Sequence, residues 1–181
     1  MGHVRGESRD QSALFPVSLD ELIPADHVSR VIDAFVARLD LGKLGFAKAS
    51  PAATGRPPYD PADLLKLYVY GYLQQVRSSR RLEAECKRNV EVMWLLGRLA
   101  TDHKTIAKFL RTQGEALRAA CAAFVRCLRE AGVVGGEWVA IDGSKFRAAA
   151  SRKAVPSIGA LERQVGEYLA TLDASDAADG A

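Results

Sequence analysis

The sequence predicts a mostly α-helical protein with one short β segment and a C-terminal helix. Three observations lead to this fold class. Apolar residues recur at i, i+3 and i+4 along most of the chain, capping residues and prolines mark helix starts, and glycines mark helix ends. Only one segment, residues 138–142, is β-prone. With 181 residues, 48% of them hydrophobic, the chain can bury a core without disulfides.

Two helices are expected in the first part of the chain. Asp26 is a candidate N-cap for a helix with apolar positions from Val28 to Leu39. Residues 47–58 predict a linker or a long loop because paired prolines disfavour helix. Asp60 then caps a second helix with Pro61 in its first turn. That helix is apolar on more than one face, which predicts a central, buried position.

Three basic or apolar helices follow. Ser78 and Ser79 can cap a helix over about 79–88, and Asn89 starts a short apolar helix that ends at Gly97. Thr101 or Asp102 caps the next, which is one long helix or two helices joined near Gly114. Residues 79–113 thus predict a helix-turn-helix-like segment that could place one helix in a DNA major groove. The alternative is an ordinary helical bundle with a solvated basic face.

The pattern changes after Gly132. Residues 138–142 predict a strand, Gly143-Ser144 a turn, and 145–150 a second strand or an extended run. A strand that ends in Asp142-Gly143 can hold a carboxylate for Mg²⁺, although Asp-Gly is also a common plain turn. We expect 138–150 to pack on the helices or to be poorly ordered. Ser157 can cap a last helix over 158–172, followed by a frayed polar tail.

Charge is unevenly distributed along the chain. Residues 77–118 carry 10 basic and 5 acidic side chains, net +5, whereas residues 156–181 carry 1 and 5, net −4. A polyanion would therefore be attracted to the middle of the chain. Glu83 and Glu85 are close enough along their helix to pair with Arg80 and Arg81. Trp94 lies in an apolar run and is expected in the core rather than as a base-stacking platform.

Several classes of function are excluded or disfavoured. The sequence has no apolar run long enough to span a membrane and no secretory h-region. Its 3 cysteines lack CxxC spacing, and its 3 histidines lie in different predicted elements, so a structural zinc site is not expected. There is no P-loop and no GxGxxG motif. The chain is expected in a reducing, cytoplasmic setting.

Several motifs, taken in order, resemble one protein family. The first runs Gly55-Arg56-Pro57-Pro58-Tyr59-Asp60-Pro61 and continues into Leu64-Leu65-Lys66-Leu67-Tyr68. The next are Ser79-Arg80-Arg81-Leu82-Glu83, Asn89-Val90-Glu91 and Asp102-His103 with Thr105-Ile106. The last is Ala140-Ile141-Asp142-Gly143-Ser144-Lys145. Together they resemble insertion-sequence DDE transposases with an InsH-like N-terminal domain, over about residues 14–154.

The resemblance implies two units: a helical InsH-like N-terminal domain over residues 1–131, and over 132–181 the truncated start of a DDE catalytic domain with an RNase H-like fold. In such enzymes two Asp and one Glu hold two divalent metals, with Mg²⁺ expected for a complete member. By that analogy Asp142 is the first acid, and it ligates metal only if the rest of the catalytic domain is supplied. The second Asp and the Glu are expected beyond Ala181, so this chain alone is expected to be inactive and to hold no cofactor.

The resemblance also implies that the chain binds DNA, namely insertion-sequence terminal repeats, and that it is cytoplasmic and nucleoid-associated. The expected contacts are Arg80, Arg81, Lys87, Arg88, Lys104, Lys108 and Arg111, with Lys145 and Arg147 near the DNA path. Two alternatives remain. The chain could dimerise with itself or inhibit a full-length transposase through the apolar face of 158–172, or it could be a non-functional remnant.

Overall fold

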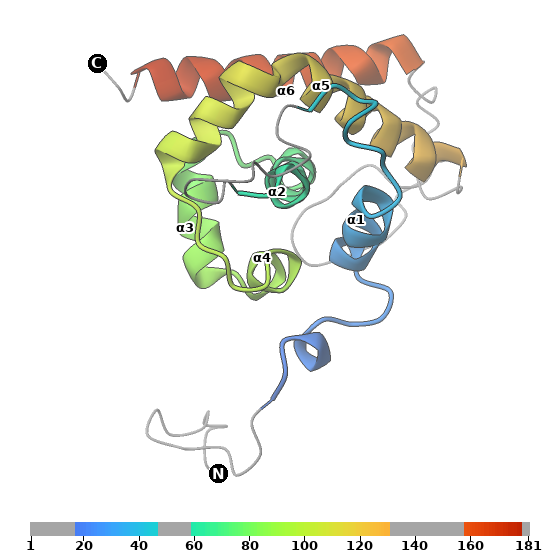
Figure 1. Cartoon of the computed structure of the whole chain (residues 1–181), viewed down its shortest axis with the longest axis vertical. Coiled ribbons are helices and arrows are strands. Elements are labelled where there is room, and N and C mark those ends of the chain that lie inside the picture. Colours follow the sequence, from blue (N-terminus) through green and yellow to red (C-terminus); the bar gives the residue numbers. More distant parts are fainter. Residues whose placement is uncertain (1–16, 47–58, 131–157, 179–181) are drawn as a thin grey trace, which may run out of the picture.

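The computed structural model describes residues 17–46, 59–130 and 158–178 (Figure 1). Within these ranges the chain is mostly helical and contains no strand, so the helical part of the predicted fold class is confirmed. The predicted β segment at 138–150 lies outside the described residues. The elements are a short 3-10 helix, η1 (Asp20–Leu22), and the helices α1 (Val28–Val36), α2 (Pro61–Leu73), α3 (Ser79–Arg88), α4 (Val90–Leu95), α5 (His103–Glu130) and α6 (Ile158–Ala178).

Helix α2 lies at the centre of the molecule. Figure 1 shows it nearly end-on, with α1, α3, α4 and α5 around it. The predicted cap is confirmed, because the Asp60 Oδ1 accepts a hydrogen bond from the Ala62 N–H at 2.8 Å, with Pro61 in the first turn. The predicted burial is confirmed as well. Its buried side chains cover every side of the helix: Leu64, Leu65, Leu67, Tyr68, Val69 and Tyr70.

A buried hydrogen bond joins α2 to α5. The Tyr68 hydroxyl donates to the Ile106 carbonyl oxygen at 2.8 Å, and both side chains are fully buried. Burial raises the pKa of Tyr68, so the hydroxyl stays protonated and remains a donor. The Tyr68 ring also stacks on Phe109, which in turn stacks on Phe46. The first turns of α5 are therefore fixed against the core.

The first helix differs from the prediction at both ends. It is capped by His27, whose Nδ1 accepts from the Ser29 N–H at 3.2 Å, while Asp26 lies exposed before it. It ends at Val36, whereas the apolar period continues to Leu39. The backbone instead turns with i to i−3 hydrogen bonds, Leu39 N–H to Val36 O among them. These turns redirect the chain before it reaches Phe46 in the core.

Helix α5 is one helix with a bend. Gln113 has non-helical angles, φ −125° and ψ 15°, next to Gly114. Just before the bend, the Thr112 hydroxyl donates to the Lys108 carbonyl at 2.9 Å, a side-chain-to-backbone bond that favours bending. The sequence left open one long helix or two joined near Gly114, and the structure has a continuous but kinked α5.

Helix α6 packs antiparallel to α5 and is longer than predicted (Figure 1). It continues to Ala178 through residues that were expected to fray. Its apolar side chains are buried: Val165, Tyr168, Leu169 and Leu172. The Tyr168 hydroxyl donates to the Val76 carbonyl at 2.8 Å, and its ring meets Tyr72 edge-on at 5.4 Å. The part of the face suggested for dimerisation that runs from Val165 to Leu172 is thus covered within the chain.

The predicted boundary at 131/132 therefore has described helices on both sides that share one core. The assignment of 132–181 to a catalytic unit stays a prediction.

Replacing Gly71 by Ala should loosen the contact between α2 and α6. A Cβ on Gly71 would lie 2.6 Å from the Tyr168 Oη and 2.8 Å from the Leu82 Cδ2, so α6 or its tyrosine must move. We expect Gly71→Ala to lower the free energy of unfolding by about 1–3 kcal/mol, as overpacking usually does. Urea unfolding measures this change. Gly166→Ala is the matched control, because a Cβ there meets nothing within 4 Å. Equal stability of the two variants would contradict the close packing.

Candidate nucleic-acid interface

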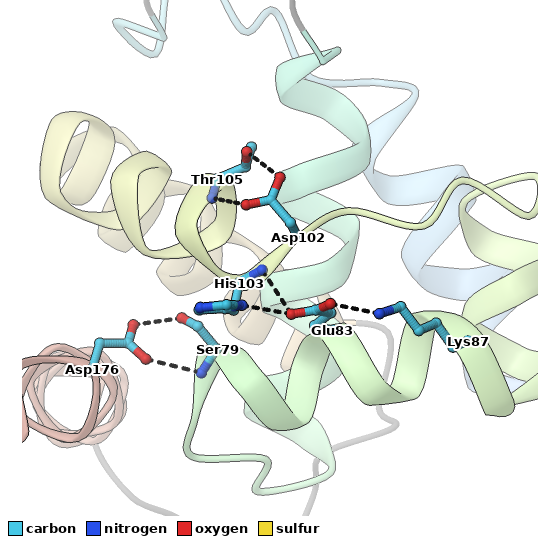
Figure 2. Close-up of polar contacts among 7 residues, drawn as sticks. All are labelled: Ser79, Glu83, Lys87, Asp102, His103, Thr105 and Asp176. Carbon is cyan, nitrogen blue, oxygen red and sulfur yellow. Dashed lines mark hydrogen bonds and ion pairs between the residues drawn. The ribbon is translucent and has the colours of Figure 1, made fainter. Parts of the chain in front are cut away.

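The N-terminus of α3 is capped by a side chain from α6. Ser78 precedes the helix in an extended conformation and forms no side-chain capping bond. Asp176 instead accepts hydrogen bonds from both the Ser79 N–H, at 3.1 Å, and the Ser79 hydroxyl (Figure 2). This role of Asp176 was not predicted, because the sequence there is typical of a frayed tail. Past Leu172 the i+3 and i+4 positions are Ser175 and Asp176, so the apolar period gave no indication of this role.

The N-terminus of α5 is capped by two carboxylates. The Asp102 Oδ1 accepts from the Thr105 N–H at 2.9 Å, and its Oδ2 from the Thr105 hydroxyl at 2.7 Å. Of the two predicted caps, Asp102 is the one used. Glu83 of α3 adds a second, since its Oε2 accepts from the His103 N–H at 3.1 Å and lies 2.7 Å from the His103 Nδ1 (Figure 2).

The electrostatics of Glu83 follow from these contacts. Its Oε1 lies 2.5 Å from the Lys87 Nζ. The pKa of Glu83 is lowered to about 2, mainly by the hydrogen bond from Lys87 and next by the hydrogen bonds from His103. Glu83 therefore stays ionised at neutral pH and ties α3 to the first turn of α5.

These caps decide where a phosphate could bind. Helix N-termini attract anions through their free N–H groups and their dipole. In α3 and α5 those positions are filled by Asp176, Glu83 and Asp102 from the chain itself. A polyanion on this surface must therefore be held by cationic side chains.

The outer face of α5 carries the clearest set of such cations. Lys104, Lys108 and Arg111 are exposed and follow i, i+4 and i+7 spacing, so they share one face ahead of the bend. We call these three residues the α5 basic stripe. Among the residues that the structure describes, no carboxylate forms an ion pair with any of them.

The cations of α3 are differently placed. Lys87 pairs with Glu83 and Arg88 with Glu85, each at 2.5 Å. The sequence suggested that Arg80 and Arg81 could pair with these glutamates, and the ion pairs that the structure describes for them are those with Lys87 and Arg88. The i, i+4 order with Glu first favours the Lys87 pair. Arg80 and Arg81 are both exposed.

The connections between the helices bear on the predicted helix-turn-helix. Helices α3 and α4 are joined through Asn89 alone, whose Oδ1 caps α4 by accepting from the Glu91 N–H at 2.9 Å. Helices α4 and α5 are separated by residues 96–102, which include Gly97 and Arg98 at positive φ. A typical helix-turn-helix has a shorter turn of 3–4 residues. The motif therefore stays a prediction.

The family model for the transposase domain (DUF772) matches residues 17–112 of the 181, from before η1 to the residue that precedes the bend in α5. The chain belongs to this transposase domain family. No curated protein and no solved structure gives a significant match.

Within this transposase domain, Trp94 has a structural role. Its indole N–H donates to the Asp20 Oδ1 at 2.9 Å, and the Arg30 guanidinium lies 5.0 Å from its ring centre. Arg30 also pairs with Asp20 at 3.0 Å. The half-buried ring thus fastens η1 to α4, which agrees with a packing role rather than base stacking.

The remaining predicted site residues cannot be placed. Asp142, Lys145 and Arg147 lie outside the described residues. Among the residues that are described, no group of three His, Cys, Asp or Glu side chains could hold a metal ion. In the same part of the chain no helix is long and apolar enough to cross a membrane.

Glu83→Gln should weaken the junction of α3 and α5 in a pH-dependent way. Because the folded state lowers the pKa of Glu83 from 4.5 to about 2, its contribution is complete above about pH 4.5 and is lost as pH falls through 2. We expect the variant to lose about 1 kcal/mol of unfolding free energy at neutral pH, because glutamine keeps an acceptor but loses the charge that Lys87 and the N-terminus of α5 stabilise. The gap to the parent protein should close towards pH 2.

Urea unfolding across this pH range measures the effect, with Glu167→Gln as the control on an exposed part of α6. A stability gap that did not change with pH would show that the charge of Glu83 is not what links the two helices.

Proposed function

We propose that these helices are the DNA-binding portion of an insertion-sequence transposase, with the terminal repeats of the element as their DNA partner. Membership of the transposase domain family supports an activity on DNA. The observation that carries the proposal is the α5 basic stripe. Lys104, Lys108 and Arg111 lie on one exposed helix face, and no described carboxylate neutralises them.

Elementary electrostatics supports this use of the stripe. Side chains one turn apart on a helix are close enough to meet successive phosphates of one DNA backbone. Each contact releases condensed counterions, so binding would weaken steeply with salt. The internal caps favour the same mechanism, because they leave side-chain cations as the groups available to hold phosphates.

Helix α5 is the helix that we place against the DNA. Its first turns are held by the Tyr68 hydroxyl, by Asp102 and by Glu83, which gives its outer face a fixed orientation. Recognition helices contact base edges through residues of their first turns, while flanking residues contact the backbone. In this arrangement Lys104 is closest to the bases, and Lys108 and Arg111 follow the backbone.

DNA cleavage is not assigned to the described helices. By family resemblance Asp142 would be the first carboxylate of a metal site that needs two more acids, and Mg²⁺ would supply the activation of water there. A dimerising function is not proposed either, since the apolar face of α6 is buried against α5 and α2.

Charge reversal in the stripe tests the proposal. The double variant Lys104→Glu/Lys108→Glu should reduce the slope of log affinity against log salt by about two units for duplex DNA, since each lost phosphate contact contributes about 0.9. Fluorescence anisotropy over a series of salt concentrations measures this slope.

The control is Arg38→Glu/Lys43→Glu, a matched double reversal at two exposed cations outside the stripe. It should leave the slope much closer to that of the parent. If both doubles lowered affinity equally, binding would depend on net charge alone and the stripe would not be the interface.

A further inference from the structure

A second basic feature, apart from the α5 basic stripe, lies on the side of α3 that faces the end of α2. An open groove of about 510 Å³ runs between the end of α2 and the outer face of α3. Its polar lining comprises two amides, three guanidinium groups and one carboxylate: Gln74, Gln75, Arg80, Arg81, Arg88 and Glu85. We call it the α3 groove. The balance of charge along its wall is positive.

The single carboxylate of the groove is already engaged. Glu85 accepts from the Arg88 Nε at 3.0 Å and from the Asn89 Nδ2 at 2.7 Å. Arg81 is exposed and forms no ion pair with a described residue. Arg81, Ala84 and Arg88 follow i, i+3 and i+7 spacing, so two guanidinium groups flank the small Ala84 on one face. This leaves room for an anion over Ala84.

The opposite wall of the groove is held in place by several contacts. Gln75 has a left-handed φ of 54°, which is strained for a residue other than glycine. Its side-chain amide donates to the Tyr72 carbonyl and accepts from the Arg77 Nη2, both at 2.9 Å. Val76 is fixed by the hydrogen bond from Tyr168 of α6. The turn between α2 and α3 is therefore a defined surface.

We propose that the α3 groove binds a phosphate group. Arg81 would be the anchoring side chain, and Arg88 would approach the phosphate from two turns further along α3. The Gln74 amide would donate a hydrogen bond to the phosphate from the facing wall. Guanidinium groups suit this ligand because their planar N–H donors match two phosphate oxygens at once. The phosphate comes from a DNA backbone, in which case the inference rests on the proposed function, or from a soluble phosphate compound.

The groove is separate from the α5 basic stripe. Glu83 and Lys87 occupy the side of α3 that faces α5, whereas Arg81 and Arg88 line the side that faces the end of α2. A DNA phosphate in the groove would therefore be a backbone contact independent of Lys104 and Lys108. The two sites can be tested one at a time.

The test uses two pairs of single variants, one pair at exposed arginines and one pair at alanines. Arg81→Gln removes the proposed anchor, and Arg38→Gln removes an exposed charge outside the groove. With duplex DNA, Arg81→Gln should lower the salt slope by about one unit, and Arg38→Gln should not. Ala84→Glu, which places a carboxylate in the groove, should weaken binding as well, whereas Ala34→Glu on the exposed part of α1 should not.

A second measurement separates the two sources of phosphate. Inorganic pyrophosphate is titrated into the parent protein and the Arg81→Gln variant, and arginine side-chain NMR shifts are followed. Saturable shifts in the parent, lost in the variant, with DNA binding unchanged, would identify a soluble phosphate ligand. A lowered DNA slope would identify the backbone.

If Arg81→Gln and Ala84→Glu changed neither the DNA slope nor the pyrophosphate shifts, the groove would bind no phosphate. The proposed function would still stand in that case if Lys104→Glu/Lys108→Glu lowered the slope. It would fail separately if that double variant behaved like its own control.

Discussion

The structure depends on one constraint, which is that α2 is apolar on more than one face and must be enclosed. Leu64, Leu65 and Leu67 are buried together with the ring of Tyr68, so one neighbouring helix could not cover them. The other helices surround α2 for this reason. The Tyr68 hydroxyl, which is buried in this core, is satisfied by a carbonyl of α5. The enclosure of α2 thus also sets the position of the helix that carries the basic stripe.

A second level of organisation comes from carboxylates that cap helices other than their own. Asp176 of α6 caps α3, and Glu83 of α3 caps α5. The caps link α6, α3 and α5 in series, so the orientation of each helix depends on the one before it. They also use up the anion-binding ends of α3 and α5, which moves any contact with a polyanion to lysine and arginine side chains on the helix faces.

Local patterns predicted the features that depend on local physics. The central position of α2, its Asp60 cap and the Asp102 cap of α5 all follow from residues close together in the chain. Asp26 and His27 are both candidate N-caps of α1, and capping propensity alone predicted Asp26, whereas the structure uses His27. The Asp176 cap joins residues 97 apart and has no sequence signature. Likewise, which cations pair with Glu83 and with Glu85 depends on which side of α3 faces α5, and only the packed structure determines that.

The close approach at Gly71 has a consequence for how relatives of this chain can vary. Position 71 lacks space for a Cβ because the Tyr168 hydroxyl stands over it, and that hydroxyl is held there by the Val76 carbonyl. The two positions therefore share one small volume. A side chain can be added at 71 only when 168 becomes smaller and the Leu82 side chain also shifts, and the freed Val76 carbonyl then needs another donor. Substitutions at 71 and 168 should accordingly arise as compensated pairs, and not as independent drift at two sites.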